Sequence, residues 1–236
     1  MPAWRADLHV HTVLSACAET EMIPPLLIAR CREQGILLLG AADHNSAGNA
    51  EAVVEAAAGS GVVVKPGLEV ESRESVHVLC LFDEVAQALD LQRLVYEHLP
   101  ALPSTAAARS FGQQSLVDGE GAFLRHEEHA LFSSTGLSLA ELVAQARARG
   151  ALVLAAHADR RAHGLLGVLG FVPDDLPLDG LECGPGGLLP GRIASSDAHR
   201  LAEIGSRYTV FEASGTGVEE LRCSLAEGRF RTGLAL

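Results

Sequence analysis

Residues 6–12 read ADLHVHT, an apolar strand pattern that carries two histidines at its end. Side chains two positions apart on a strand point to the same face, so His9 and His11 can both be directed at one metal ion. One such pair is only moderately specific, because core packing also places histidines on strands. The pair gains weight from similar polar groups at the ends of other predicted strands.

The rest of the chain alternates short β-rich apolar runs with helical patterns. The predicted strands are Ala6–Thr12, Ile36–Ala42, Val62–Val70, Val76–Phe82, Ala151–Ala156, Gly180–Cys183, Ile193–Ser196 and Tyr208–Glu212. The predicted helices are Pro24–Gln34, Ala47–Ala58, Glu84–His98, Ser138–Arg149, Asp159–Leu169, a short one near Leu201, and Val218–Glu227. This alternation predicts parallel strands with crossover helices and a closed or nearly closed barrel.

Histidines and carboxylates recur where these strands begin or end. They are Asp43 and His44, Glu69 and Glu71, His77, His157, and Asp197 and His199. In a parallel barrel the carboxyl ends of all strands lie on one face, where the active sites of such folds gather. Each residue alone has another explanation, as a core histidine, a solvated charge or a helix cap. Together they predict a metal cluster at that face.

Six short motifs carry a resemblance to a known family. DLHVHT, ADHN, GLEVE, VHVLCLF, AAHAD and SSDAH resemble, in this order, the motifs of the PHP (polymerase and histidinol phosphatase) family, over residues 7 to about 205. The chain is most similar to the free-standing PHP metal-dependent phosphoesterases. The resemblance implies an α/β fold, a distorted seven-stranded TIM-like (β/α)7 barrel. It also implies two to three divalent metal ions, commonly zinc, manganese or iron, at the carboxyl ends of the strands.

The resemblance also implies which residues bind each metal. The first site would use His9, His11, Glu69 and Asp197, and the second would use Glu69 as a bridge with His77 and His157. His44 and His199 match ligands of a third site. Family members usually place an Asp or His in the loop after HxHT, where this chain has Cys17. Cys17 is therefore either a thiolate ligand that favours zinc or iron, or a small packing residue beside a weak third site.

Several polar residues near these motifs have supporting or surface roles in the prediction. Asp43 is expected to orient a histidine rather than bind metal. Glu71 is equally compatible with a supporting role and with a solvated surface. His126 and His129 are expected to share a helix face on a polar surface, and His98 and His163 have no assigned role.

The domain prediction is one barrel over residues 1–236, with an insertion at about residues 100–136. The insertion interrupts the strand and helix rhythm and contains a hairpin pattern around Asp118-Gly119. Such a segment can cover one end of the barrel as a lid, or it can be a surface insertion without a function.

Composition limits the possible partners. The net charge is −12, with 18 Lys and Arg against 30 Asp and Glu, and Lys65 is the one lysine. Because backbone binding to nucleic acid needs clustered cations, we expect a small phosphorylated substrate and no long duplex nucleic acid. The longest apolar run, Ile36–Ala42, is far shorter than the ~20 residues of a membrane span, and no signal peptide pattern is present. The five cysteines are widely scattered, which argues against a disulfide framework and indicates free thiols. The sequence therefore predicts a cytoplasmic protein.

The predicted reaction is hydrolysis of a small phosphomonoester by a metal-activated water. Clustered divalent ions acidify a bound water and neutralise phosphate oxygens, so no protein nucleophile is required. The chain indeed lacks a GxSxG elbow, a P-loop and a Rossmann glycine motif. The residues expected at the reacting groups are Asp197, His199 and His44. Arg160, Arg161 and Arg200 are candidates for binding the phosphate, with solvated helix starts as the alternative.

Two other functions remain open at this point. One is a nuclease or nucleotide phosphatase that acts on short nucleic acid. The other is a non-catalytic metal-binding protein with a structural or regulatory role. Substrate identity, metal identity and oligomeric state are not predictable from the sequence, because specificity lies in loops.

Overall fold

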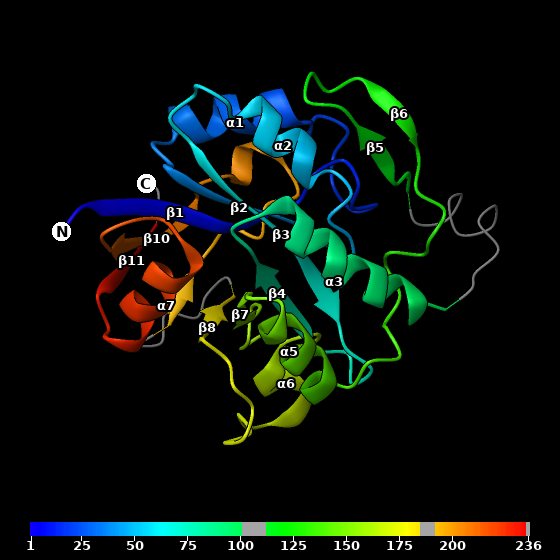
Figure 1. The fold of residues 1–236 in the computed structure, drawn as a ribbon, viewed down its shortest axis with the longest axis vertical. Helices are drawn as coiled ribbons and strands as arrows, with labels where there is room; N and C mark the ends of the chain where they lie inside the picture. Colours follow the sequence, from blue (N-terminus) through cyan, green and yellow to red (C-terminus); the bar gives the residue numbers. More distant parts are fainter. Residues whose placement is uncertain (101–111, 185–191, 235–236) are drawn as a thin grey trace.

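The computed structural model describes residues 1–100, 112–184 and 192–234. A nine-stranded sheet forms its centre, with the strand order β11-β10-β1-β2-β3-β4-β7-β8-β9 (Figure 1). The strands are β1 (Ala3–Val10), β2 (Leu38–His44), β3 (Val63–Glu71), β4 (His77–Leu81), β7 (Leu152–Ala155), β8 (Gly180–Cys183), β9 (Ile193–Ala194), β10 (Arg207–Glu212) and β11 (Phe230–Leu234).

The sheet curls into a distorted barrel, as expected. Seven of its strands follow one another from β1 to β9, and the segment after β9 returns to β1. There the backbone N–H of His11 donates to the carbonyl of Ala198 at 3.0 Å, and the N–H of Ala198 donates to the carbonyl of His9 at 3.3 Å. Strands β10 and β11 continue the sheet beyond β1 in antiparallel orientation, so the sheet has more strands than the seven of the predicted barrel.

Strand directions differ from the all-parallel expectation at one position that matters for the site. The pairs β1–β2, β2–β3, β7–β8 and β8–β9 are parallel, but β4 is antiparallel to both of its neighbours. The first residue of β4, His77, therefore pairs with the last residue of β3, Glu71. This reversal explains how a histidine that opens a strand lies at the same end of the barrel as residues that close strands.

Helices cover the outside of the sheet (Figure 1). Helices α1 (Pro24–Glu33) and α2 (Ala50–Ala56) pack against β1 and β2, and helices α3 (Val85–Glu97), α5 (Leu139–Ala148) and α6 (Leu165–Leu169) pack against β3, β4 and β7. Helix α7 (Val218–Ala226) packs against the inner apolar cluster, which includes Leu8, Leu79, Leu154 and Phe211. The predicted helix at Asp159–Leu169 is shorter than expected, because turns precede Leu165, and the short helix near Leu201 is a 3-10 turn (Leu201–Glu203).

An irregularity in β1 directs its side chains. Leu8 packs in the inner cluster and Val10 packs against the outer helices. The pairing with β2 shifts register between Asp7 and Val10. This bulge allows two successive residues, Leu8 and His9, to face the barrel interior.

The described part of the insertion contains the predicted hairpin, formed by β5 (Ser115–Val117) and β6 (Phe123–His126). Asn49 at the start of α2 holds it, because its side chain accepts from the N–H of Val117 and donates to the carbonyl of Ser115, both at 3.0 Å. The expected helix that would present His126 with His129 is wrong, since His126 is an exposed strand residue. The first part of the insertion, residues 101–111, lies outside the described residues, and a lid role stays a prediction.

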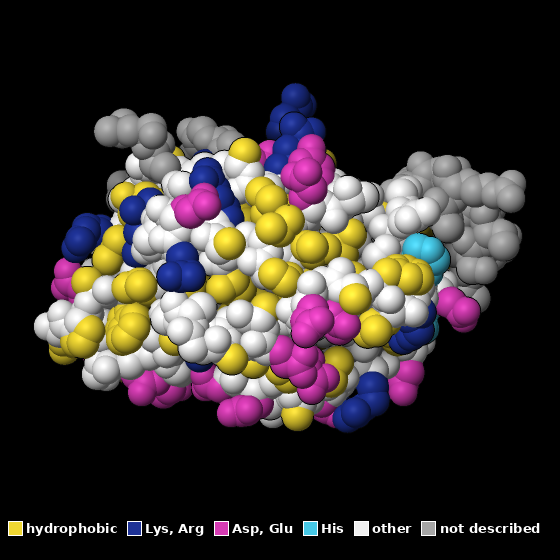
Figure 2. Space-filling view, turned by 90° about the horizontal axis from the view of Figure 1, so that it is seen from above, with side chains coloured by type: hydrophobic (Ala, Val, Ile, Leu, Met, Phe, Trp, Pro, Cys, Tyr) yellow, Lys and Arg dark blue, Asp and Glu magenta, His cyan; other side chains and the backbone are white. Residues whose placement is uncertain are grey.

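The described surface is mixed in character. On the face shown in Figure 2, Lys and Arg side chains are scattered, while several Asp and Glu side chains lie along the lower edge. Within the described ranges, no helix is long and apolar enough to cross a membrane.

Gly40 in β2 sits where two strands approach closely. A Cβ atom at this position would collide with the backbone carbonyl group of Leu8 in β1. The collision is with backbone, so a side-chain rotation cannot relieve it, and only glycine fits.

We expect Gly40→Ala to lower the free energy of unfolding by about 1–3 kcal/mol, because the added methyl group forces β1 and β2 apart. Urea denaturation measures this change. Gly136→Ala is a matched control, since a Cβ there would meet only atoms at 3.6 Å or beyond. Equal stability of the two variants would contradict the close approach of the strands.

Candidate metal centre

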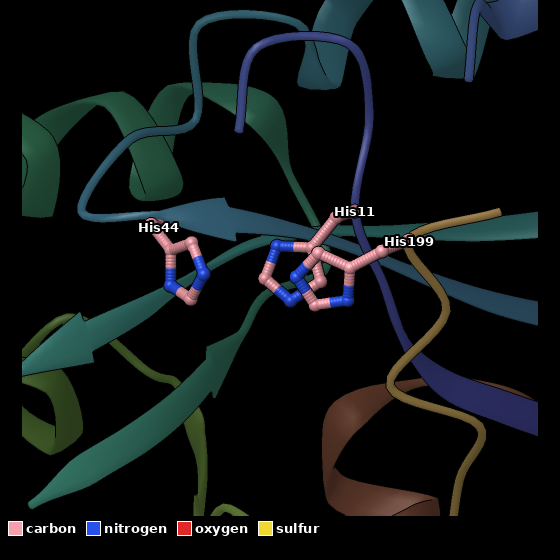
Figure 3. A group of neighbouring side chains, drawn as sticks. All are labelled: His11, His44 and His199. Carbon is pink, nitrogen blue, oxygen red and sulfur yellow. The ribbon is translucent and has the colours of Figure 1, made fainter. Parts of the chain in front are cut away.

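Seven of the ten histidines converge at the end of the barrel where β1, β2 and β3 finish. They are His9, His11, His44, His77, His157, His163 and His199. The rings of His11, His44 and His199 lie together although they come from three separate segments (Figure 3). The His11 ring centroid is 4.5 Å from that of His44 and 4.1 Å from that of His199. This convergence confirms that the spaced motifs meet in space.

Glu69 lies at the centre of the histidines and is almost completely buried. Each of its carboxylate oxygens faces a different group of rings. Oε1 lies 2.8 Å from His77 Nδ1, 2.9 Å from His157 Nε2 and 3.3 Å from His9 Nε2, while Oε2 lies 2.9 Å from His44 Nδ1 and 3.6 Å from His11 Nε2. Both oxygens of this one carboxylate therefore lie close to histidine nitrogens from several strands.

Asp197 completes the first expected ligand set. Its Oδ1 lies 3.2 Å from His11 Nε2 and 3.5 Å from His9 Nε2. It belongs to the segment that closes the barrel on β1, so barrel closure and site assembly depend on the same residues. His9, His11, Glu69 and Asp197 therefore share one location.

The donor set fits divalent metal ions. His9 Nε2 is buried and has no hydrogen-bond partner, which is unusual for a buried polar atom unless an ion binds there. Burial opposes ionisation of Glu69, but His77, His9 and His44 outweigh it and hold the pKa of the carboxyl well below its usual range. Imidazole and carboxylate groups are ligands for zinc, manganese and iron. The site is thus suited to divalent metal binding.

Cys17 lies beside the histidines expected at the third site. Ligand atoms of His11, His44 and His199 lie within 4.8 Å of one another. Burial raises the pKa of the Cys17 thiol, but hydrogen bonds to His199 and His44 outweigh this effect and lower the pKa to about 6. A thiolate at this place has the correct chemistry for a ligand, and its role stays a prediction.

Glu182 on β8 is a supporting residue that sequence reasoning missed. Its Oε2 lies 2.9 Å from His9 Nδ1 and accepts from the backbone N–H of His157 at 3.0 Å. One buried carboxylate therefore orients the ring of one expected ligand, His9, and the backbone of another, His157. The one sequence feature that pointed to Glu182 was its charge within the short, otherwise uncharged strand GLEC.

Asp43 and Glu71 also support histidines of the centre. Asp43 accepts from the hydroxyl of Ser15 at 2.6 Å, and Ser15 Oγ lies 2.9 Å from His11 Nδ1. Asp43 thus reaches a histidine through Ser15 rather than directly. Glu71 is nearly buried, with Oε2 at 3.5 Å from His77 Nε2, so it supports a histidine and is not a solvated charge.

Backbone strain concentrates around the centre. Five non-glycine residues in the described ranges have positive φ, and four of them border the site: Asn45 (51°), His157 (29°), His163 (62°) and Asp197 (54°). Such conformations cost on the order of 1–3 kcal/mol each and persist where the surrounding structure enforces them. His163, without an expected role, is one of these residues, and its ring stacks on His77 at 4.5 Å.

The three candidate arginines differ in position. Arg160 Nη2 lies 2.9 Å from Asp197 Oδ2, and its side chain is 44% exposed. Arg200 pairs instead with Glu19 at 3.2 Å, and Arg161 is exposed. Arg160 is thus the arginine that touches a residue of the centre.

Comparison with known proteins identifies the fold. Residues 191–230, which include Asp197 and His199, match the family model described as PHP-associated. No curated protein matches the chain in sequence. The lesion-specific endonuclease Q from Pyrococcus furiosus is similar in structure, with a TM-score of 0.71, 19% identity, and coverage of 98% of this chain and 58% of that chain.

Two further solved structures are similar. Endonuclease Q in complex with a 27-mer duplex has a TM-score of 0.71 at 18% identity, over 96% of this chain and 57% of that chain. A two-domain protein from Bacteroides vulgatus, assigned a PHP-like metal-dependent phosphoesterase, has a TM-score of 0.56 at 13% identity, over 99% of this chain and 65% of that chain. The chain therefore spans less than two thirds of each of these proteins.

The exclusion of long duplex nucleic acid in favour of a small substrate is wrong. Endonuclease Q, which shares this fold, binds a duplex with an abasic lesion at its active site. A net charge of −12 does not exclude such a ligand, because net charge does not describe the local arrangement of cations around a site.

The fold and the matched segment agree with each other. The distorted barrel is shared with these solved structures, and the matched segment contains two of the predicted ligands. The histidine and carboxylate motifs meet at one end of the barrel. The chain thus has a fold that is shared with a PHP-like protein, and its residues 191–230 match the PHP-associated family model.

Proposed function

We propose that the protein is a metal-dependent hydrolase of phosphate esters. The observation that carries the proposal is the buried Glu69, whose two oxygens face histidines from several strands. The expected class agrees with the names of its structural neighbours, an endonuclease and an assigned phosphoesterase. We further propose zinc, manganese or iron as the metal and two to three ions as the number.

Each residue of the centre has a defined task in this proposal. His9, His11, Glu69 and Asp197 would hold one ion, and Glu69, His77 and His157 a second. When bound, these ions supply an acidified water and positive charge against the phosphate oxygens. The guanidinium of Arg160, next to Asp197, binds a phosphate oxygen, and His199 or His44 gives a proton to the leaving oxygen.

A second candidate function is cleavage of phosphodiesters in nucleic acid. It is favoured by the TM-score of 0.71 with endonuclease Q, compared with 0.56 for the PHP-like protein from Bacteroides vulgatus. Both functions would use the same metal-activated water and the same centre. They differ in the substrate, which is a phosphomonoester in one case and a phosphodiester in the other.

Phosphate release and strand cleavage should be measured with one preparation. The substrates are a panel of phosphomonoesters, including histidinol phosphate and nucleotides, and oligonucleotides as single strands and as duplexes with and without an abasic site. We expect hydrolysis of one class after resupply of manganese, zinc or iron, and loss of hydrolysis with retained circular dichroism after chelation. Turnover by chelated protein would contradict the proposal, and unfolding on chelation would instead support a structural metal.

Replacement of Glu69 by Gln should release about two equivalents of bound metal, because one neutral amide would replace a bridging carboxylate. Asp197→Asn should release about one equivalent and abolish turnover. Elemental analysis of purified protein measures both changes. Glu128→Gln, at an exposed position outside the centre, is the control. Full metal content in the Glu69 variant would contradict the bridging role.

Cys17→Ser tests the third site alone. If the thiolate is a ligand, the variant should lose about one metal equivalent while the ions at Glu69 remain, since a serine hydroxyl is a poor ligand at neutral pH. Unchanged stoichiometry would show that Cys17 is not a ligand. Cys223→Ser, another exposed thiol far from the centre in sequence, is the matched control.

A further inference from the structure

We propose that a cavity beside the metal ligands receives the organic group of the phosphate ester, and that Phe132 and His163 make it selective for a flat group without negative charge. The inference rests on the proposed function. The cavity has a volume of about 210 Å³. Its lining includes Cys17 and His44 at the metal end, together with Glu71, Leu131, Phe132 and His163.

The wall that carries Phe132 comes from the end of the insertion and is fixed to the centre. The side-chain amide of Asn45, which follows His44, donates to the carbonyls of Leu131 at 2.7 Å and Ser133 at 2.9 Å. Its Oδ1 accepts from the N–H of Glu71 at 3.0 Å. These bonds hold residues 131–133 against the strand ends that carry the ligands, so the wall is formed before a substrate arrives.

Ser134 and Thr135 continue the attachment. The hydroxyl of Ser134 donates to Glu71 Oε1 at 2.7 Å, and the N–H of Thr135 donates to the Glu71 carbonyl at 2.9 Å. Glu71 therefore contacts the ligand His77 and the insertion at once. The end of the insertion is thus held in a fixed position relative to His77.

His163 supplies a second ring to the same cavity. Its backbone is left-handed, with φ at 62°, and its carbonyl accepts from the N–H of His77 at 2.9 Å. Its ring stacks on His77, and its buried Nδ1, 3.5 Å from Glu71 Oε1, has no hydrogen-bond partner. The side chain is nevertheless 44% exposed, so part of this fixed ring is open to the cavity.

The chemistry of the lining defines the ligand. The rings of Phe132 and His163 and the side chain of Leu131 favour an aromatic or other flat group, whereas the carboxylate of Glu71 repels a second anion and attracts a hydrogen-bond donor. The flat group can belong to a free ester or to one unit of a polymer, because the cavity would contact the same ring in both.

Binding of unhydrolysable analogues tests the cavity without turnover. Calorimetry of metal-loaded protein with phenylphosphonate, 4-carboxyphenylphosphonate and methylphosphonate should show tightest binding of the first. Phe132→Ala and His163→Ala should each weaken phenylphosphonate binding about fivefold to tenfold, change methylphosphonate binding less than about twofold, and retain bound metal. Phe123→Ala, a 56% exposed phenylalanine on β6, is the matched control.

Unchanged phenylphosphonate binding in both cavity variants would overturn the proposal, as would equal weakening for methylphosphonate. Hydrolysis by the native protein with no preference for aryl esters would also contradict it while leaving the proposed function intact. Absence of all hydrolysis with selective phenylphosphonate binding would contradict only the proposed function. Displacement of phenylphosphonate by a nucleoside monophosphate or by a duplex oligonucleotide would support the cavity and identify the source of the group.

Discussion

The contacts between the buried carboxylate of Glu69 and the surrounding histidine rings are the interaction on which the rest of the centre depends. An isolated carboxylate is costly to remove from water, and it is retained where opposite charges compensate it. Here the compensation comes from histidine rings on β1, β2 and β4 and from the segment after β7. The same requirement explains why polar groups occupy one end of a barrel whose other end is filled by leucines and Phe211.

Assembly of the centre requires closure of the barrel. Asp197 and His199 lie in the segment that pairs with β1, and Asp197 has a left-handed backbone. Asp7 in β1 helps to hold this segment in place, because its carboxylate accepts hydrogen bonds from the N–H groups of Ser196 and Gly205. The site is therefore a consequence of the curvature of the whole sheet and not of any single loop.

The insertion has a closer relation to the centre than its position in the chain suggests. Asn45 and Glu71 belong to the motifs that carry ligands, yet their hydrogen bonds hold residues 131–135. Residues that support metal binding thus also shape the space next to it. In the proposed function this arrangement separates two properties of the molecule, since the reaction would depend on the strand ends and the selectivity on residues 131–135.

Much of the fold, and the convergence of the candidate ligands at one end of the barrel, was predictable from the sequence. Local periodicity along the chain indicates the alternation of strands and helices. The motifs HxH, ADHN, GLEVE and SSDAH can be read directly from the sequence with their spacing. The resemblance of these motifs to a family then predicted which residues would be ligands, because chemistry at strand ends requires particular residue types at particular spacings.

Other features were decided only by the tertiary structure. The reversal of β4, the bond from Glu182 to His9, the stacking of His163 on His77 and the attachment of the insertion through Asn45 all join residues far apart in the chain or depend on strand direction. Local patterns contain no information on such partners. A charged residue in a short strand or a histidine in a turn has the same local signature whether it supports a metal ligand or faces water, and only the packing of the closed barrel distinguishes the two.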